Sequence, residues 1–246
     1  MKQQGQFPLP PFSIYGITVH YELYNYEPNS NKNNVRINSW LFLSSTFSYR
    51  RLIPLLAQHG AVVALDLPPF GKSDKSKDFT YSYRNMANIV VSLVEHLHLS
   101  NIILVGHSMG GQIALYISKQ RPDLVDKNST HLQLGIFTKN HTFPLSTPRT
   151  CHFFICTLKK LACAKRRTEK NLLNVIHDRS LIDDEMMQGY AAPFFDERIF
   201  HALTRMIRDR EGDLPSCELQ QIEIPSLLIW GEEDKVVPIS VGKTPA

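Results

Sequence analysis

Apolar and polar positions alternate near the start of the chain. Every second residue of 17–23 is apolar, and a shorter apolar run, Phe12–Tyr15, precedes this segment across Gly16. A period of two is typical of half-buried strands, and a glycine suits a tight turn between them. We therefore expect the chain to open with a hairpin.

The following segments alternate between buried strands and amphipathic helices. Continuous apolar runs at 61–65 and 102–105 predict buried strands, and apolar residues at helical spacing predict helices over 82–97 and 109–121. A short helix is expected at 51–59. Strands that alternate with helices predict an α/β fold, with a mostly parallel sheet flanked by helices.

Two more helices and one more strand are predicted in the second half. Segments 180–187 and 197–208 are amphipathic, and Gly212 lies beyond the end of the second. We interpret their Met and Phe residues as packed core rather than as the wall of a substrate site. The apolar run 224–230 predicts a return to a core strand.

A Gly-x-Ser-x-Gly pattern joins the predicted strand 102–105 to the predicted helix 109–121. In this context it is typical of a nucleophile elbow, a turn so tight that the serine takes a strained backbone conformation. Gly106 and Gly110 would let the strand and the helix approach closely. Ser108 is therefore the candidate nucleophile, and the start of the helix would turn the N–H of Met109 toward developing negative charge.

Two segments are too polar for the central strands expected there. In the first segment, 35–41, the polar residues Arg36, Asn38 and Ser39 interrupt the apolar ones. The second segment, 127–135, is similarly polar. Burying an unpaired polar group costs about 1–3 kcal/mol. We therefore expect local irregularity at 35–41 and 128–167.

Composition favours one globular domain with an insertion. The 246 residues are 43% hydrophobic and 20% charged, enough for one sizeable core. The net charge is +4, but 128–170 holds eight Lys and Arg against one Glu, so the excess is local and nucleic acid is not an expected partner. Residues 1–11 lack an apolar signal core and no apolar run is long enough to span a membrane, so we expect a cytoplasmic location.

Four cysteines in a chain of this length do not predict a disulfide framework. Cys151, Cys156 and Cys163, with His152 beside them, are conceivable metal ligands. Their spacing matches no usual zinc pattern. We expect neither a metal nor a cofactor.

The motifs resemble those of the α/β-hydrolase fold family, and the resemblance covers most of the chain. The elbow reads Gly-His-Ser-Met-Gly-Gly over 106–111. Residues 66–73 resemble the family's Asp-x-Pro-Gly-x-Gly-x-Ser loop, with Pro69 in place of its first glycine. Trp230-Gly231-Glu232-Glu233-Asp234, followed by Pro238, resembles the loop that carries the catalytic acid.

This resemblance implies an α/β-hydrolase fold with a core at 12–127 and 213–246 and an inserted helical cap at 128–212. It implies that Asp234 is the acid of a Ser-Asp-His triad and that Asp66 is structural. It also implies an oxyanion hole formed by the N–H groups of Met109 and Phe42.

The resemblance suggests a hypothesis for the two polar segments. Codons for 35–41, read one base later, can encode Phe-Val-Leu-Ile-His-Gly-Phe, the family's strand and oxyanion motif. Codons for 128–137 can likewise encode Thr-Ala-Leu-Ile-Cys-Ser-Ser-Gly-Tyr-Leu. Paired frame shifts flanking each stretch would explain both.

The triad's base cannot be assigned. The family order is Ser, then acid, then His, but the ten histidines end at His201, before Asp234. We interpret His20 as a solvated strand residue and His107 as a packed or loop residue. The resemblance thus implies a chain truncated before the histidine loop.

The predicted function is that of a serine hydrolase acting on a small carboxylic ester or similar carbonyl compound through an acyl-enzyme, impaired because the histidine is missing. One alternative is a C–C bond hydrolase of the ring-cleavage type, whose elbow is similar. Another is a decayed copy without enzymatic activity. Ser108 disfavours dehalogenases and epoxide hydrolases, which use an Asp nucleophile. The oligomeric state is left open.

Overall fold

The computed structural model describes residues 11–26, 34–39, 46–126, 130–134, 173, 176–209 and 211–234, and at 34–39 and 130–134 it describes the backbone alone. The strands are β1 (Phe12–Ile14), β2 (Ile17–Val19), β3 (Tyr21–Tyr24), β4 (Asn34–Ser39), β5 (Ala61–Asp66), β6 (Ile102–Ser108), β7 (Thr130–Leu134) and β8 (Ser226–Leu228). The helices are η1 (Thr46–Tyr49), α1 (Ile53–Leu56), α2 (Tyr83–His96), α3 (Met109–Gln120), η2 (Arg179–Leu181), α6 (Asp184–Ala191), η3 (Ala192–Phe195), α7 (Arg198–Arg208) and α8 (Ser216–Leu219).

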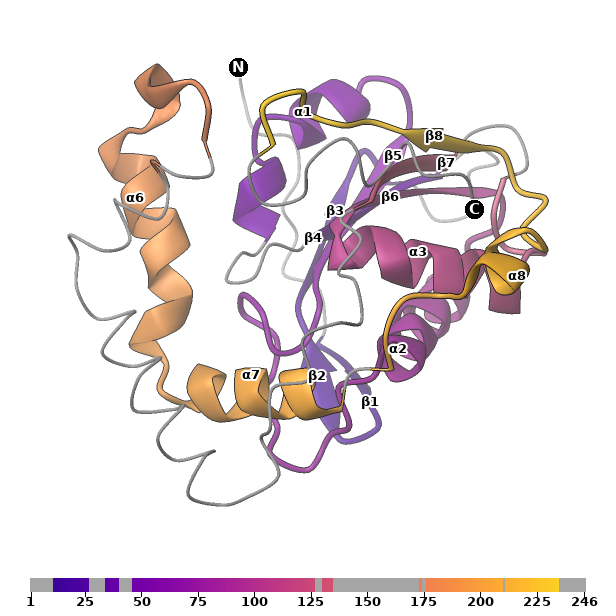
Figure 1. Ribbon diagram of the computed structural model, residues 1–246, viewed down its shortest axis with the longest axis horizontal. Coiled ribbons are helices and arrows are strands. Elements are labelled where there is room, and N and C mark those ends of the chain that lie inside the picture. Colours follow the sequence, from indigo (N-terminus) through magenta and orange to yellow (C-terminus); the bar gives the residue numbers. More distant parts are fainter. Residues whose placement is uncertain are drawn as a thin grey trace.

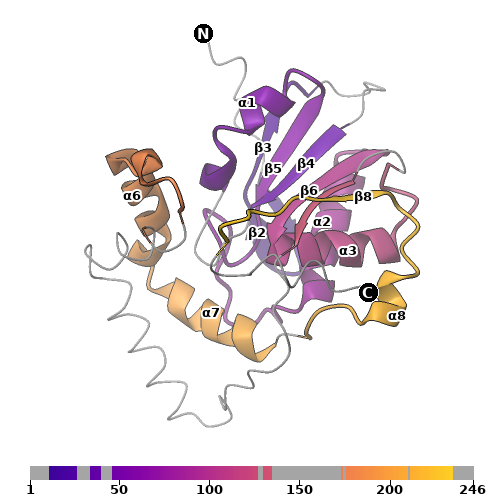
Figure 2. The same cartoon turned by 45° about the horizontal axis from the view of Figure 1, so that its top comes forward.

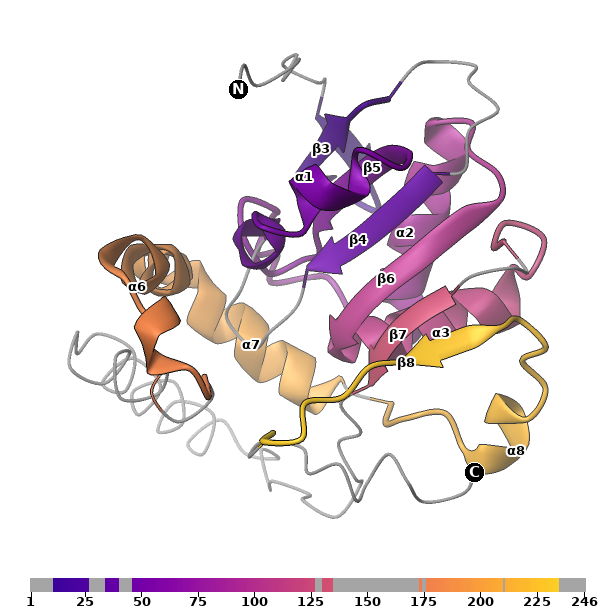
Figure 3. The ribbon, with the colours of Figure 1, turned by 90° about the horizontal axis from the view of Figure 1, so that it is seen from above.

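The centre of the fold is a six-stranded sheet in the order β3-β5-β4-β6-β7-β8. β3 is antiparallel to β5, and the other pairs are parallel. Helices α2 and α3 cover one face of the sheet and α1 lies on the other (Figures 1 and 3). The predicted α/β architecture is confirmed, and the two strands on which it most depends, β6 and β8, lie in the same sheet.

The predicted hairpin forms between β1 and β2, with Tyr15 and Gly16 at positive φ in its turn. The alternating segment does not continue as one strand, however. It breaks at His20, after which β3 leaves the hairpin and pairs with β5 in the large sheet. Alternation marks burial on one face, and it does not specify the partner strand.

The helices predicted at 82–97 and 109–121 correspond to α2 and α3. The Ser82 hydroxyl accepts the Asn85 N–H at 3.1 Å and caps α2. Both helices bury their apolar residues in one large core with β1, β2, β5 and β6. This core fixes where β6 ends and α3 begins.

The two polar segments form strands. β4 pairs in unbroken parallel register with β5 and β6, and β7 pairs with β6 and β8. The prediction of irregular structure is therefore wrong for 35–39 and 130–134. Backbone N–H and C=O groups pair whatever the side chain, so apolar neighbours can hold a polar strand in register. The rest of 35–41 and 128–167 lies outside the described residues.

Helices α6 and α7 lie in the segment predicted as a cap, and Figure 2 shows them beside the sheet rather than in its two helical layers. Asp183 caps α6 by accepting the Met186 N–H at 2.7 Å. Phe200 and Met206 of α7 were predicted to form the core of the cap, and they are buried instead in the large core that also contains α2 and α3.

β8 departs from the predicted core strand. It forms one edge of the sheet, and Leu227, Leu228 and Ile229 are 47%, 47% and 55% exposed. Ile224, just before the strand, is buried. An edge strand has a partner on one side only, so an apolar run alone does not guarantee burial.

Candidate functional site

Ser108 sits at the junction where β6 passes directly into α3. Its backbone has φ 55° and ψ −123°, a conformation rare for any residue except glycine. The residue is half-buried. The structure thus gives Ser108 the strained turn that a nucleophile elbow requires.

The glycine before the elbow is required by a close approach of strand and helix. A Cβ atom on Gly106 would lie 2.4 Å from the carbonyl oxygen of Gly110 and 2.7 Å from the backbone nitrogen of Gly111. Real Cβ atoms do not come so close to backbone, so no other residue fits without a shift of β6 against α3. This confirms the predicted packing role of Gly106, and that of Gly110 stays a prediction.

Met109 is the first residue of α3, a helix of 12 residues. The first-turn N–H groups of a helix lack partners within it and carry its positive dipole end. The Met109 N–H is therefore in a position suited to an oxyanion, and its role as donor stays a prediction. Phe42, the second predicted donor, lies outside the described residues.

Asp234 follows β8, at the end of the sheet where β6 also terminates. β6, β7 and β8 are parallel, so their carboxyl ends share one edge (Figure 3). The Asp234 N–H donates to the Gly231 carbonyl at 3.2 Å, which closes a turn, and the residue is half-buried. Ligands of open α/β sheets bind at this edge. The topology therefore places Ser108 and Asp234 at the same end of the sheet.

His20 is tied to a different partner. Its ring Nε2 lies 3.1 Å from Glu22 Oε1, and it precedes β3, which β5 and β4 separate from β6 in the sheet. Three strand spacings amount to about 14 Å. His20 is thus too far along the sheet to serve Ser108 directly.

A second polar centre lies at the carboxyl end of β5. The Asp66 carboxylate is buried, with Oδ1 accepting the Thr46 N–H at 2.6 Å and Oδ2 accepting the Lys72 N–H at 2.9 Å. The Ser73 hydroxyl donates to the Asp66 carbonyl. Burial raises the pKa of the Asp66 carboxyl, and the two N–H groups act against that shift. Its predicted structural role agrees with these contacts.

The bond from Thr46 to Asp66 was not anticipated from the sequence. Thr46 begins η1, the short helix that follows the loop expected to carry the second oxyanion donor. Asp66 therefore anchors the first residue of η1. No sequence pattern signals a carboxylate that accepts an N–H 20 residues away.

η1 also contacts α6 and the turn at Ser108. The rings of Phe47 and Tyr190 meet edge to face at 5.7 Å, and a Cβ atom on Gly189 would lie 2.2 Å from the Phe47 ring. Arg50 Nε lies 3.1 Å from Glu185 Oε1. The Tyr49 hydroxyl is buried, which raises its pKa, and the nearby His107 N–H acts against that rise. η1 is thus packed between α6 and the elbow.

Among the described residues, no group of three or more His, Cys, Asp or Glu side chains could hold a metal ion. Cys151, Cys156, Cys163 and His152 lie outside those residues. In the same part of the chain, no helix is both long and apolar enough to cross a membrane.

Comparison with known proteins agrees with this geometry. A family model of the alpha/beta hydrolase fold matches residues 40–130. The uncharacterized hydrolase YugF of Bacillus subtilis is 44% identical over 236 residues, spanning 96% of this chain and 84% of that protein. A 2-hydroxymuconate semialdehyde hydrolase of Pseudomonas sp. is 28% identical over 205 residues, spanning 80% of this chain and 68% of that protein. A crystal structure of a bacterial membrane phospholipase A superposes with a TM-score of 0.73 at 22% identity, covering 96% of this chain and 76% of that one.

Proposed function

Because the chain belongs to the α/β-hydrolase fold family, we propose that it is a serine hydrolase whose nucleophile is Ser108. The observation that carries the proposal is the positive φ of Ser108 at a strand–helix junction too tight for a side chain on Gly106. Such strain persists only where the surrounding structure imposes it, and it is common at catalytic residues. The substrate class is a small carboxylic ester or a similar carbonyl compound.

The chemistry proceeds in two steps. Ser108 Oγ bonds to the carbonyl carbon while a base takes its proton, and the tetrahedral oxyanion faces the Met109 N–H at the start of α3. The leaving group departs with a proton and leaves an acyl-enzyme. Water then attacks the acyl carbon and releases the acid and free Ser108. Asp234 is the proposed acid that orients the base.

Attack by Ser108 on the carbonyl carbon requires a base. A neutral serine attacks a carbonyl only if its proton is accepted in the transition state, and none of the ten histidines follows Asp234. Loss of a triad member leaves only what the oxyanion hole and binding provide, often several orders of magnitude less. We therefore propose that this polypeptide hydrolyses esters slowly.

Ring-cleavage C–C hydrolysis is the second candidate. It is supported by the relative that is 28% identical and is named a 2-hydroxymuconate semialdehyde hydrolase. A panel of p-nitrophenyl esters set against a dienoic diketo acid separates the two, with Ser108→Ala as the blank. Ester turnover alone supports the first candidate, and turnover of the diketo acid alone overturns it.

A decayed copy without activity is the third candidate, and it is linked to the frame-shift hypothesis for 35–41 and 128–137. Soluble expression with a cooperative melt counts against this candidate, and aggregation supports it. Resequencing the gene decides the frame-shift hypothesis. Compensating insertions and deletions that flank both segments, relative to the gene of a close relative, are the expected result, and an unbroken reading frame contradicts it.

A further inference from the structure

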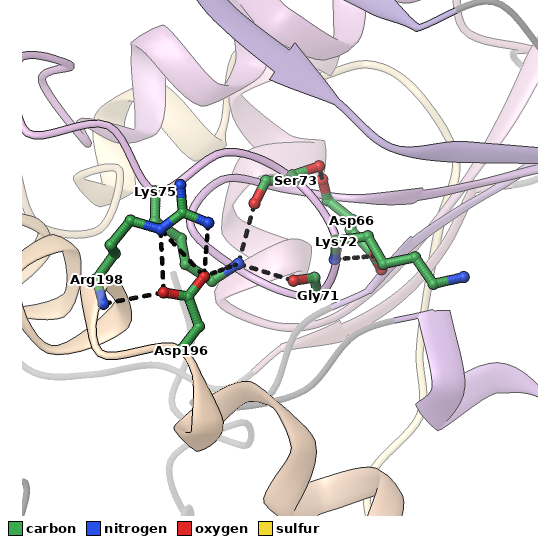
Figure 4. A network of polar contacts seen from close by, with 7 residues as sticks. All are labelled: Asp66, Gly71, Lys72, Ser73, Lys75, Asp196 and Arg198. Carbon is green, nitrogen blue, oxygen red and sulfur yellow. Dashed lines mark hydrogen bonds and ion pairs between the residues drawn. The ribbon is translucent and has the colours of Figure 1, made fainter.

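A buried ammonium group lies between the core and the cap. The Lys75 side chain is 5% exposed, and its Nζ donates to the Gly71 carbonyl at 2.8 Å and to the Ser73 carbonyl at 3.1 Å. Asp196 Oδ2 faces the same Nζ at 3.8 Å (Figure 4). A charged group at this depth requires partners, so these three contacts hold the Lys75 amine in one place.

Asp196 belongs to the cap side of this contact. It connects η3 to α7, and Asp196 Oδ1 accepts the Arg198 N–H at 3.0 Å. The Arg198 guanidinium also binds the carboxylate, with Nη2 2.8 Å from Oδ2. One carboxylate thus holds the start of α7 and faces Lys75. A displacement of this segment would move the negative charge away from the buried amine.

The loop held by Lys75 is wrapped around Asp66. A Cβ atom on Gly71 would lie 2.1 Å from Asp66 Oδ2, so the backbone of Gly71 presses against that carboxylate. The Lys72 N–H binds one carboxylate oxygen and the Thr46 N–H binds the other. Polar contacts therefore run without a break from Asp196 through Lys75 and the loop to Asp66 and Thr46.

We propose that Lys75 is a positioning residue that couples the cap segment 192–198 to Thr46, and thereby to η1. With Asp196 in place, Lys75 holds the carbonyls of Gly71 and Ser73. The Lys72 N–H and the Ser73 hydroxyl of the same loop bind Asp66, and Asp66 holds the start of η1. The catalytic consequence rests on the proposed function, because the loop before η1 is where the second oxyanion donor is predicted. The coupling itself does not depend on catalysis.

Hydrogen exchange at the Thr46 amide, followed by NMR, tests the coupling in the full chain. Lys75→Met removes the ammonium and keeps an unbranched side chain of similar length. The Thr46 amide should exchange about tenfold faster, while amides within α2 keep their rates. Lys72→Met is the matched control, because Lys72 is a neighbouring lysine whose side chain extends away from Asp196 (Figure 4). In that control the Thr46 amide should be unchanged.

Two variants in the segment 192–198 test the same coupling and can replace Lys75→Met if that protein does not fold. Asp196→Asn should also accelerate exchange at Thr46, whereas Arg198→Gln, which leaves the carboxylate facing Lys75, should not. Lys75→Arg should restore most of the protection, since it keeps a cation there. An unchanged Thr46 amide in a folded Lys75→Met or Asp196→Asn protein overturns the proposal. Equal acceleration in the Lys72→Met control also overturns it.

Labelling of Ser108 by a fluorophosphonate probe measures the catalytic consequence. Lys75→Met should reduce the maximal labelling rate about tenfold with little change in the probe concentration that gives half of that rate, because loss of an oxyanion contact acts on the transition state. If the parent chain is not labelled even in imidazole, the proposed function fails and the exchange result still decides the coupling. Faster exchange at Thr46 with an unchanged labelling rate overturns the catalytic part alone.

Discussion

The carboxyl ends of β5 and β6 turn at the same edge of the sheet, yet they use their polar residues in opposite ways. At β5, the Asp66 carboxylate is buried and both of its oxygens accept backbone N–H groups. At β6, the polar residue is half-buried and its backbone is strained. A buried side chain whose hydrogen bonds are all made stabilises structure, whereas a half-buried serine with a strained backbone beside a helix N-terminus is suited to reaction.

The comparison shows that a matching motif does not by itself tell whether its polar residue has a structural or a catalytic role. Both turns contain glycine pressed against a neighbour, at Gly71 and at Gly106. At Gly71 the neighbour is the carboxylate that anchors η1. At Gly106 it is the backbone of α3, the helix that begins directly after Ser108. Substitutions at the two turns should therefore produce different combinations of stability loss and activity loss.

Gly106→Ala should have the largest effect, lowering the free energy of unfolding by about 3–5 kcal/mol or preventing folding, since the new methyl group would overlap the backbone of α3. Gly16→Ala is the control, because its turn has open space around it and only the positive φ opposes a side chain. Urea unfolding followed by circular dichroism measures both. A loss at Gly106 no greater than that at Gly16 would show that β6 and α3 are not in close contact.

Asp66→Asn should lower the free energy of unfolding by about 2–3 kcal/mol, because an amide can accept one N–H but turns its own NH₂ toward the other. Asp74→Asn is the matched control in the same loop. Its carboxylate accepts the Thr18 N–H at 2.7 Å in an exposed setting, and a loss below about 1 kcal/mol is expected. Equal losses in the two variants would mean that the buried bonds to Thr46 and Lys72 contribute no more than an exposed one.

The free energy of unfolding should also depend on pH, because Glu22 of β3 is part of a partly buried polar contact. The His20 hydrogen bond, opposed by burial and aided by Tyr24 and by the charges of His20 and Lys72, lowers the pKa of Glu22 to about 2. A depressed carboxyl pKa stabilises the fold above the unfolded value near 4.5, and that contribution is lost as the pH falls toward 2. We expect the free energy of unfolding to fall by about 1–2 kcal/mol over this pH range. This is less than the full pKa shift would give, because the Glu22–His20 pair is partly solvated.

Glu22→Gln isolates this contribution from other carboxyl groups. The difference in unfolding free energy between the parent and Glu22→Gln should be largest near pH 6 and should shrink below pH 4.5. A difference that stays constant from pH 6 to pH 3 would contradict the depressed pKa.

Ser108→Gly should have the smallest effect, and it should stabilise the protein. Relief of the positive φ is expected to raise the free energy of unfolding by about 1 kcal/mol relative to Ser108→Ala, which keeps the strain. Differential scanning calorimetry of the two variants compares them directly. A glycine variant no more stable than the alanine variant would mean that the conformation of Ser108 carries no strain.

The sequence predicted the elements that follow from local patterns. Helices α2 and α3, the hairpin and the elbow all appear within a few residues of their expected positions, because periodicity, capping and glycine spacing act locally. The strands at 34–39 and 130–134 could not be predicted, because their pairing comes from neighbours and not from their own polar side chains. The bond between Asp66 and Thr46 and the Lys75 contact with Asp196 join residues far apart in the chain, and no spacing rule reveals them.

Fluorophosphonate labelling of the 246-residue chain, mapped by mass spectrometry and repeated in imidazole, tests the central claim most directly. The account predicts slow labelling confined to Ser108, accelerated by imidazole because the dissolved base accepts the serine proton, and absent from Ser108→Ala. Rapid labelling without imidazole would contradict this prediction and assign the role of base to a histidine upstream of Asp234. Labelling at another residue, or none even in imidazole, would contradict Ser108 as the nucleophile.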